Sequence, residues 1–273
     1  TAVISLGADP GLSNVLCRTA ADRLDQIDRI GLYWIARLLG PESPVLVPPY
    51  AVSTVLAEYA KPSRQFLDGR LREVPPRTGQ ETIDLPPPFG RAEFMYTIHS
   101  EPLTVPFARG IAEKGIREMT WKLSLPEHEH QAWLALVKAG FGDFEDPIVI
   151  GNAAIKPSDF LDALLRRTRE RNAASMPAQD YHELHFAIGE GRKNGRPSRV
   201  TVKVGASRDP LYAGYGDAAT SMCMSIGVQL MLRRPLRPGV HAPEEYFDPA
   251  DFFAALKQRN FRIEVEETAF DAL

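Results

Sequence analysis

The chain has 273 residues and a formal net charge of -3, and its lysines and arginines are scattered among acidic residues, which gives no basic face for nucleic acid. No apolar run reaches the roughly 20 residues that a membrane helix needs, and the N-terminus lacks the pattern of a signal peptide. These totals predict a cytoplasmic protein of one or two domains with no membrane or nucleic-acid partner. The two cysteines, Cys17 and Cys223, are expected to be buried free thiols.

The chain begins with an apolar run, Ala2–Leu6, that has no polar face and is typical of a strand buried on both sides in a parallel sheet. Gly7 and Gly11 permit backbone angles that other residues avoid, and Pro10 disfavours helix before it, so the chain must turn at Asp9. Asp9 is then expected between a strand end and a helix start, where open α/β sheets bind ligands. Asp-Pro-Gly is equally an ordinary turn sequence.

Helical and strand patterns alternate along the rest of the chain. Ser13 or Asn14 is expected to cap the first helix, and Asp248 the last one. Further helices are predicted over Ala51–Tyr59, Gln131–Ala139, Asp159–Arg171 and Ala218–Arg233. Strands are predicted over Arg29–Ile35, Glu93–Glu101, Arg117–Leu125, Pro147–Gly151, Tyr181–Gly189, Ser198–Ala206 and Phe261–Val265. The proline-rich stretch from Val74 to Pro88 is predicted to be a long surface excursion.

Three of these segments indicate how the sheet is built. In the strand around Trp121, apolar residues alternate with Glu118, Lys122 and Ser124, which predicts that these three residues face water. Asn194-Gly195 is the strongest hairpin signal in the sequence and predicts antiparallel pairing of the strands on either side. The helix from Ala218 is apolar nearly all round, which predicts burial or an oligomer interface.

The second stretch with chemical content is His99-Ser100-Glu101-Pro102. A strand that ends there places an imidazole, a hydroxyl and a carboxylate together, because Pro102 cannot donate to a sheet ladder. Histidine is the side chain best suited to move protons near neutral pH, while a solvated strand end is the plainer interpretation. His128 and His130 point in different directions, and His182 and His185 are expected on opposite faces of a strand, so no metal site is predicted.

Three segments in order resemble the saccharopine dehydrogenase-like family: ISLGADPGLSN, PPFGRAEFMYTIHSEPLTVP and RPGVHAPEEYFDPADFFAALKQRNFRIEV. The resemblance covers almost the whole chain. It implies the substrate-binding and dimerisation part of a NAD(P)-dependent oxidoreductase that acts on a carbon–nitrogen bond of an amino-acid-derived substrate. The nucleotide-binding fingerprint Gly-x-Gly-x-x-Gly is absent, so we expect no NAD(P) binding by this chain alone and a Rossmann half supplied from upstream.

The expected fold is α/β (α+β): a mixed, largely antiparallel sheet flanked by helices, with a remnant Rossmann strand and helix at residues 1–24 and the substrate and dimerisation domain at 25–273. A homodimer through the central sheet is expected from Trp121, Tyr33 and the helix from Ala218. Position and resemblance together suggest Asp9 and His99 as catalytic, Asn14, Glu101 and Thr104 as substrate-binding, and Gly7, Pro10 and Gly11 as cofactor-binding residues. The alternative is a non-catalytic ligand-binding or dimerisation module.

Overall fold

A mixed, mostly antiparallel sheet forms the centre of the computed structural model, which describes residues 1–178, 180–207, 211 and 218–270. Within these residues nine strands join it, with seven in the order β13-β11-β10-β2-β7-β3-β4 and the β5–β6 hairpin attached through β6 to β7. The strands are β2 (Gln26–Leu39), β3 (Ser63–Leu67), β4 (Arg70–Val74), β5 (Glu81–Asp84), β6 (Arg91–Tyr96), β7 (Glu118–Ser124), β10 (Asp180–Lys193), β11 (Arg196–Gly205) and β13 (Ile263–Ala269). This arrangement confirms the predicted fold class.

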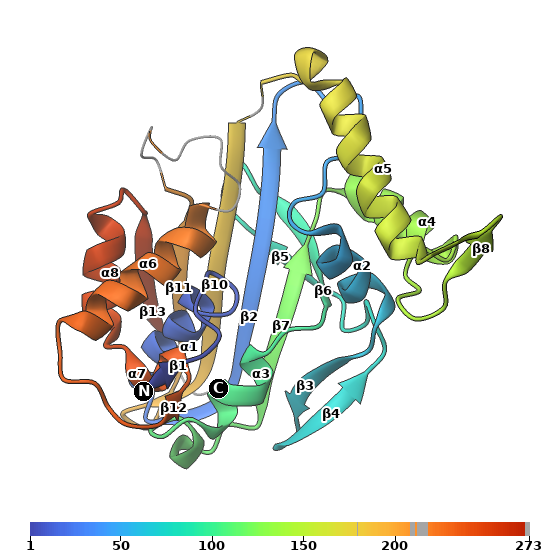
Figure 1. The fold of residues 1–273 in the computed structure, drawn as a ribbon. Coiled ribbons are helices and arrows are strands. Elements are labelled where there is room, and N and C mark those ends of the chain that lie inside the picture. The colour runs from blue at the N-terminus through green and yellow to red at the C-terminus, as the bar shows by residue number, and fades with distance from the viewer. Residues whose placement is uncertain (179, 208–210, 212–217, 271–273) are drawn as a thin grey trace.

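The helices gather into two groups around the sheet (Figure 1). One group, at the left of the figure, comprises α1 (Leu12–Asp22), α6 (Ala218–Leu232), α7 (Pro243–Tyr246) and α8 (Pro249–Lys257). The other includes α2 (Val52–Ala60), α4 (Glu127–Lys138) and α5 (Pro157–Arg171), beside a small projecting hairpin, β8 (Ile148–Ile150) and β9 (Ala153–Ile155). The short helix α3 (Glu101–Thr104) follows β6 and starts in the interior.

Two long strands set the register of the sheet. β10 pairs antiparallel with β2, which places His185 opposite Trp34, while β2 pairs parallel with β7. The predicted hairpin between β10 and β11 is confirmed, and its turn residues Asn194 and Gly195 have φ values of 51° and 75°. Both values are positive, as a tight two-residue hairpin requires.

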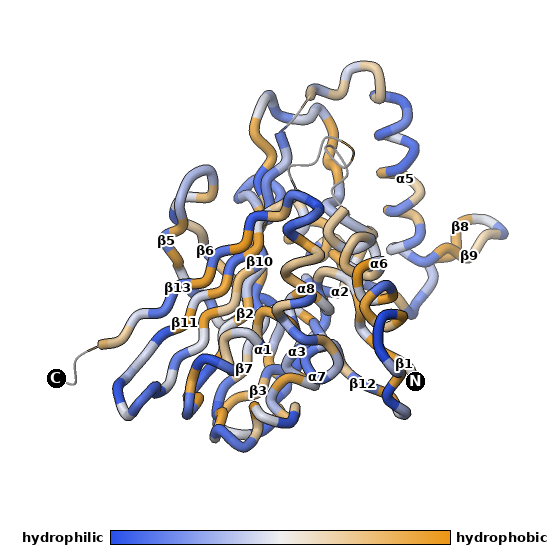
Figure 2. Tube along the Cα trace, turned by 90° about the vertical axis from the view of Figure 1, so that its left-hand side faces the viewer, coloured by the Kyte–Doolittle hydropathy of each residue, from blue (hydrophilic) through white to orange (hydrophobic). Residues whose placement is uncertain are grey.

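The sheet is covered on both faces. The main core lies on the helix side, and a smaller cluster around Tyr33, Phe94 and Phe186 lies under the β5–β6 hairpin; Figure 2 shows that hairpin and the helices on opposite sides. The prediction that Lys122 and Ser124 face water is therefore wrong, because both are buried. The Val74–Pro88 stretch is likewise not a plain excursion, since it contains β5.

The N-terminal segment differs from the sequence expectation. Only Ala2–Val3 forms a strand, β1, which pairs parallel with β12 (Val240–His241) away from the main sheet. Ile4 is 47% exposed, so the prediction of a strand buried on both faces is wrong. The reason is that β12, the only strand paired with β1 among the described residues, has just two residues and cannot bury Ala2–Leu6. Leu24 and Ile27, on either side of the predicted boundary, lie in one core, and the division at residue 24 stays a prediction.

Helix α1 packs directly against β10 of the sheet. A side chain at Gly189 of β10 would place its Cβ 3.2 Å from the Cβ of Ala20. The neighbouring core-facing position is Ala187, which is also small and fully buried. Small residues on β10 therefore allow the close packing of α1.

Helix α6 is buried on one face only. Cys223 and Ile226 are fully buried, whereas Met224, Val228 and Leu232 form an exposed apolar stripe at i, i+4 spacing. Trp121 and Tyr33 are buried within this chain, so their assignment to a dimer interface is wrong. Cys17 and Cys223 are buried free thiols, as predicted. No helix in the described part of the chain is long and apolar enough to cross a membrane.

Candidate active site

The turn before α1 is held by its own backbone. Gly7 N donates to Pro10 O at 2.8 Å, Leu12 N donates to Gly7 O at 2.9 Å, and Gly11 N donates to Asn14 Oδ1 at 2.8 Å. Gly11 has φ 134°, and a Cβ there would lie 2.2 Å from Gly7 O. These glycines therefore serve the turn itself, and Asn14 caps the helix from its third position while Gly11 occupies the cap.

The turn brings the Asp9 side chain against His185 of β10. His185 Nδ1 lies 2.6 Å from Asp9 Oδ2, and His185 Nε2 lies 3.4 Å from Glu183 Oε2. Burial disfavours the imidazolium, but the Asp9 and Glu183 carboxylates outweigh it and raise the pKa of His185 from 6.5 to about 10. Burial raises the pKa of Asp9 above its usual value, and His185 opposes that shift. The close contact favours an ionised pair.

A second imidazole–carboxylate pair forms beside the first. His99 Nδ1 lies 3.2 Å from Glu101 Oε2, and His99 Nε2 lies 3.4 Å from Glu58 Oε1 on α2. Burial disfavours the imidazolium of His99, yet Glu101 and Glu58 raise its pKa to about 10. The ring stacks on Trp121 with centroids 3.8 Å apart. The plainer interpretation of His99 and Glu101 as a solvated strand end is wrong, because Glu101 is fully buried.

Polar side chains at the start of α1 tie these pairs together. Ser13 Oγ donates to Glu101 Oε1 at 2.7 Å, and Asn14 Nδ2 donates to Glu244 Oε2 at 2.8 Å. Asn14 Nδ2 also lies 3.4 Å from Thr104 Oγ1. Burial alone would raise the pKa of Glu101, but His99 and the hydrogen bond from Ser13 hold it below the usual value.

Two carboxylate oxygens of the cluster lack a hydrogen-bond partner among the described residues: Asp9 Oδ1 and Glu244 Oε1, both buried. Burial raises the pKa of Glu244 above its usual value. A buried oxygen without a partner is costly and marks a place where a ligand or a proton can bind. The unsatisfied acceptors are thus concentrated at the start of α1.

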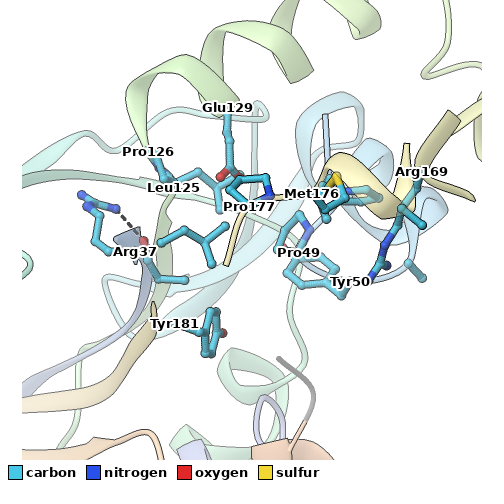
Figure 3. A pocket seen from close by; sticks show the side chains of 16 residues that line it. Arg37, Pro49, Tyr50, Leu125, Pro126, Glu129, Arg169, Met176, Pro177 and Tyr181 are labelled. Atoms are coloured by element: carbon cyan, nitrogen blue, oxygen red, sulfur yellow. Dashed lines mark hydrogen bonds between the residues drawn. The ribbon is translucent and has the colours of Figure 1, made fainter. Parts of the chain in front are cut away.

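A cavity of about 720 Å³ lies next to this cluster, between the end of β2, the start of β10 and the helices of the second group (Figure 3). Its wall includes Arg37, Tyr50, Glu129, Arg169 and Tyr181, which come from five separate segments. Prolines and Met176 supply much of the remaining wall. The mixture of apolar surface and a few charged and hydroxyl groups is typical of a small-molecule site.

The structure thus brings five predicted residues into one neighbourhood: Asp9, Asn14, His99, Glu101 and Thr104. Sequence reasoning missed the partners of these residues, which are Ser13, Tyr50, Glu58, Glu183, His185 and Glu244. His182 and His185 do lie on opposite faces, as predicted. One available signal was the alternation of β10, which places Glu183 and His185 on the face that also carries Ala187 and Gly189.

The cluster can hold and transfer protons. It combines two imidazoles that stay protonated near neutral pH with buried carboxylates, and two of these, Asp9 and Glu244, each have an oxygen without a hydrogen-bond partner among the described residues. Such groups are suited to general acid–base chemistry. Among the residues that the structure describes, no group of three or more His, Cys, Asp or Glu side chains is arranged to hold a metal ion.

Comparisons with known proteins agree with this architecture. The family model described as the saccharopine dehydrogenase C-terminal domain matches residues 7–261. The fold is similar to that of apo histidine-tagged saccharopine dehydrogenase (L-Glu forming) from Saccharomyces cerevisiae, with a TM-score of 0.69 and 12% sequence identity, over 96% of this chain and 73% of that one. At 12% identity the structural similarity shows the fold alone. Membership of the family rests on the family model, which covers most of the sequence. The chain therefore belongs to the saccharopine dehydrogenase C-terminal domain family.

Proposed function

We propose that this chain is the substrate-binding, proton-handling part of an oxidoreductase that acts on a carbon–nitrogen bond of an amino-acid-derived substrate. The observation that carries the proposal is the buried Asp9–His185 pair, with Asp9 Oδ1 left unpartnered beside the His99–Glu101 pair. Oxidation or reduction at a carbon–nitrogen bond requires a proton exchange at nitrogen or oxygen as well as a hydride transfer. The cluster supplies groups for the proton.

In this proposal Asp9 and His99 are the catalytic residues. Asp9 Oδ1 is the acceptor for the proton that is exchanged with the substrate, and His185 holds the carboxylate in place. His99 supplies a positively charged imidazolium, which is held in place between the carboxylates of Glu58 and Glu101.

The substrate-binding roles of Asn14, Glu101 and Thr104 remain part of the proposal. Asn14 and Thr104 surround the buried carboxylate of Glu244, whose second oxygen is free to contact an amino group. Glu101 is already engaged by Ser13 and His99, so it contributes to substrate binding indirectly, by keeping His99 charged.

A nicotinamide cofactor, NAD(P), is expected from the family, but residues 7–11 do not fit its phosphates. The amides of Gly7 and Gly11 are used within the turn, and Pro10 has no amide proton. We therefore assign no cofactor contact to Gly7, Pro10 or Gly11 in the proposed function. In the proposed function the nucleotide site therefore lies away from this turn.

The test is an assay of the full gene product that carries this chain, with saccharopine as substrate and NAD+ or NADP+ as oxidant, followed by nicotinamide absorbance. We expect saccharopine-dependent reduction of the nicotinamide. Asp9→Asn should lower turnover on the order of 10²- to 10⁴-fold, as expected for the loss of a general acid or base. An Asp9→Asn variant with wild-type turnover would remove Asp9 from the mechanism.

The second candidate function is a non-catalytic module that binds a small ligand or only dimerises. The misfit of the turn to a nucleotide favours it. Calorimetric titration of the 273-residue chain with saccharopine and with L-glutamate separates the two. Binding without turnover in the full gene product would support the module.

We also propose a homodimer, now through the exposed stripe of α6 formed by Met224, Val228 and Leu232. The two buried free thiols support a cytoplasmic location, because reducing compartments keep cysteines unpaired.

A further inference from the structure

Two chains of side chains with the same order of residue types run from the cavity wall into the buried cluster. The first begins at Tyr181, whose hydroxyl donates to Glu183 Oε2 at 2.9 Å. The same Glu183 oxygen lies 3.4 Å from His185 Nε2, and His185 Nδ1 lies 2.6 Å from Asp9. The sequence of groups is thus tyrosine, glutamate, histidine and acid.

The second chain repeats this order on other elements. The hydroxyl of Tyr50, also on the cavity wall, donates to Glu58 Oε2 through a very short hydrogen bond. Glu58 Oε1 lies 3.4 Å from His99 Nε2, and His99 Nδ1 lies 3.2 Å from Glu101. Both chains therefore start at one cavity and end at the carboxylates beside the start of α1.

Burial separates the two ends of each chain. Glu58 and Glu183 are 1% and 6% exposed and His185 is buried, so bulk water has little access to the His185 nitrogen atoms. The His99 side chain is 13% exposed, so His99 is the more accessible of the two histidines. Trp34 lies between the two chains. Its Nε1 is 3.5 Å from Glu183 Oε2 in the first chain, and its ring centroid is 6.0 Å from that of Tyr50 in the second. Each tyrosine links the cavity to a buried glutamate that contacts an imidazole.

We propose that Tyr50 and Tyr181 are the cavity ends of two proton relays that connect a ligand in the cavity to His99 and His185. The relays rest on the proposed function for their role in turnover, but their existence can be tested without it. The Tyr50–Glu58 and Tyr181–Glu183 links are hydrogen bonds, and hydrogen bonds in a chain polarise one another. The contacts of His185 with Glu183 and Asp9, and that of His99 with Glu58, are close ion pairs without hydrogen-bond geometry, so a small reorientation of ring or carboxylate completes each relay.

The step balances as a single proton transfer. An N–H bond of the imidazolium breaks and its proton passes to the glutamate, and the glutamate then protonates the tyrosine oxygen. At the same time the tyrosine hydroxyl gives its own proton to a basic nitrogen or oxygen of the ligand. The histidine ends neutral, the glutamate ionised, the tyrosine protonated, and the ligand gains one proton. The same steps in reverse take a proton from the ligand.

The first test measures solvent exchange of the imidazole N–H protons by NMR on the 273-residue protein with nitrogen-15-labelled histidine. Tyr50→Phe should slow exchange at His99 and leave His185 unchanged, and Tyr181→Phe should do the reverse. A loosened fold would speed exchange at both sites, so the direction separates a broken relay from structural damage. Unchanged or faster exchange in both variants would overturn the proposal.

Tyr59→Phe is the matched control. Tyr59 is a buried tyrosine on α2 whose hydroxyl contacts His130 Nδ1 at 2.9 Å, outside both chains and outside the cavity wall. It should leave the exchange of both relay histidines at the wild-type rate.

The second test uses turnover of saccharopine by the full gene product. The double variant Tyr50→Phe/Tyr181→Phe should lose kcat on the order of 10²-fold with KM almost unchanged, because proton transfer is impaired while most of the cavity wall is kept. Wild-type kcat in the double variant would overturn the relays as a route used in catalysis. A wild-type protein without turnover would instead refute the proposed function, and the exchange measurement would still decide whether the relays exist.

Discussion

Replacement of Asp9 by Asn removes the charge that holds His185 protonated, and its effect on folding can be worked out from the structure. The pKa of His185 is about 10 in the folded protein against an ordinary value of 6.5. At roughly 1.4 kcal/mol for each tenfold change, ionisation of this histidine contributes up to about 4 kcal/mol at neutral pH. The burial of the Asp9 carboxylate, which raises its own pKa, offsets part of this. We expect Asp9→Asn to lower the free energy of unfolding by about 3 kcal/mol.

The pH dependence has a definite sign. Because the pKa of His185 is raised on folding, its contribution is fully present below pH 6.5 and is lost as the pH rises toward 10. The difference in unfolding free energy between wild type and Asp9→Asn should therefore be largest near pH 6.5 and should shrink toward pH 10. Denaturant unfolding followed by tryptophan fluorescence at both ends of this range measures it.

Asp22→Asn provides the control. Asp22 also pairs with a cation, Arg18, at 2.8 Å, but its side chain is 40% exposed, so the expected loss is within about 0.5 kcal/mol. A difference for Asp9→Asn that is as small as this control, or equal at both pH values, would refute the buried ion pair. A turn residue with no partner would give that result, since Asn is also accepted in such turns.

Three further predictions concern the turn, the cofactor and α6. Gly11→Ala should destabilise the protein by several kcal/mol, on the order of the larger single-residue effects, because the added Cβ would collide with Gly7 O. In the control Gly115→Ala the Cβ meets open space, so the loss should be only about 1 kcal/mol. Equal melting temperatures of the two variants would contradict this prediction. The 273-residue chain should give a flat fluorescence titration with NADH and NADPH, and micromolar binding would reveal a nucleotide site within it. Light scattering should give a dimer that Val228→Glu converts to a monomer; a monomeric wild type at high concentration would exclude the α6 interface.

Local signals in the sequence were sufficient where a segment determines its own structure. Asn194-Gly195 fixed the β10–β11 hairpin through backbone angles, and Asp248 with Pro249 marked the start of α8, where Asp248 Oδ1 accepts from Ala250 N at 2.8 Å. These features depend on neighbours in sequence. They can be predicted without knowledge of the tertiary fold.

Features that depend on distant partners could not be predicted in this way. Lys122 looks like a solvent-facing residue, but its Nζ contacts Glu81 Oε2 at 2.5 Å beneath a hairpin that lies in a proline-rich stretch. Asp9 could be placed at a turn, yet its partner His185 lies far along the chain and becomes adjacent only when α1 packs on β10. The candidate residues of the site were thus accessible from sequence, and their pairing was not.

The packing of α1 on β10 has a consequence for how the site can vary. Gly189 and Ala187 set how near α1 approaches the sheet, and Asp9 is carried by the turn that starts this helix. A larger residue at Gly189 would push the helix outward and lengthen the Asp9–His185 contact without touching either side chain. The distance between α1 and the sheet would thus affect the pKa of His185 through the length of its contact with Asp9. A substitution at a packing position could therefore change the chemistry of the cluster while all of its polar residues stay the same.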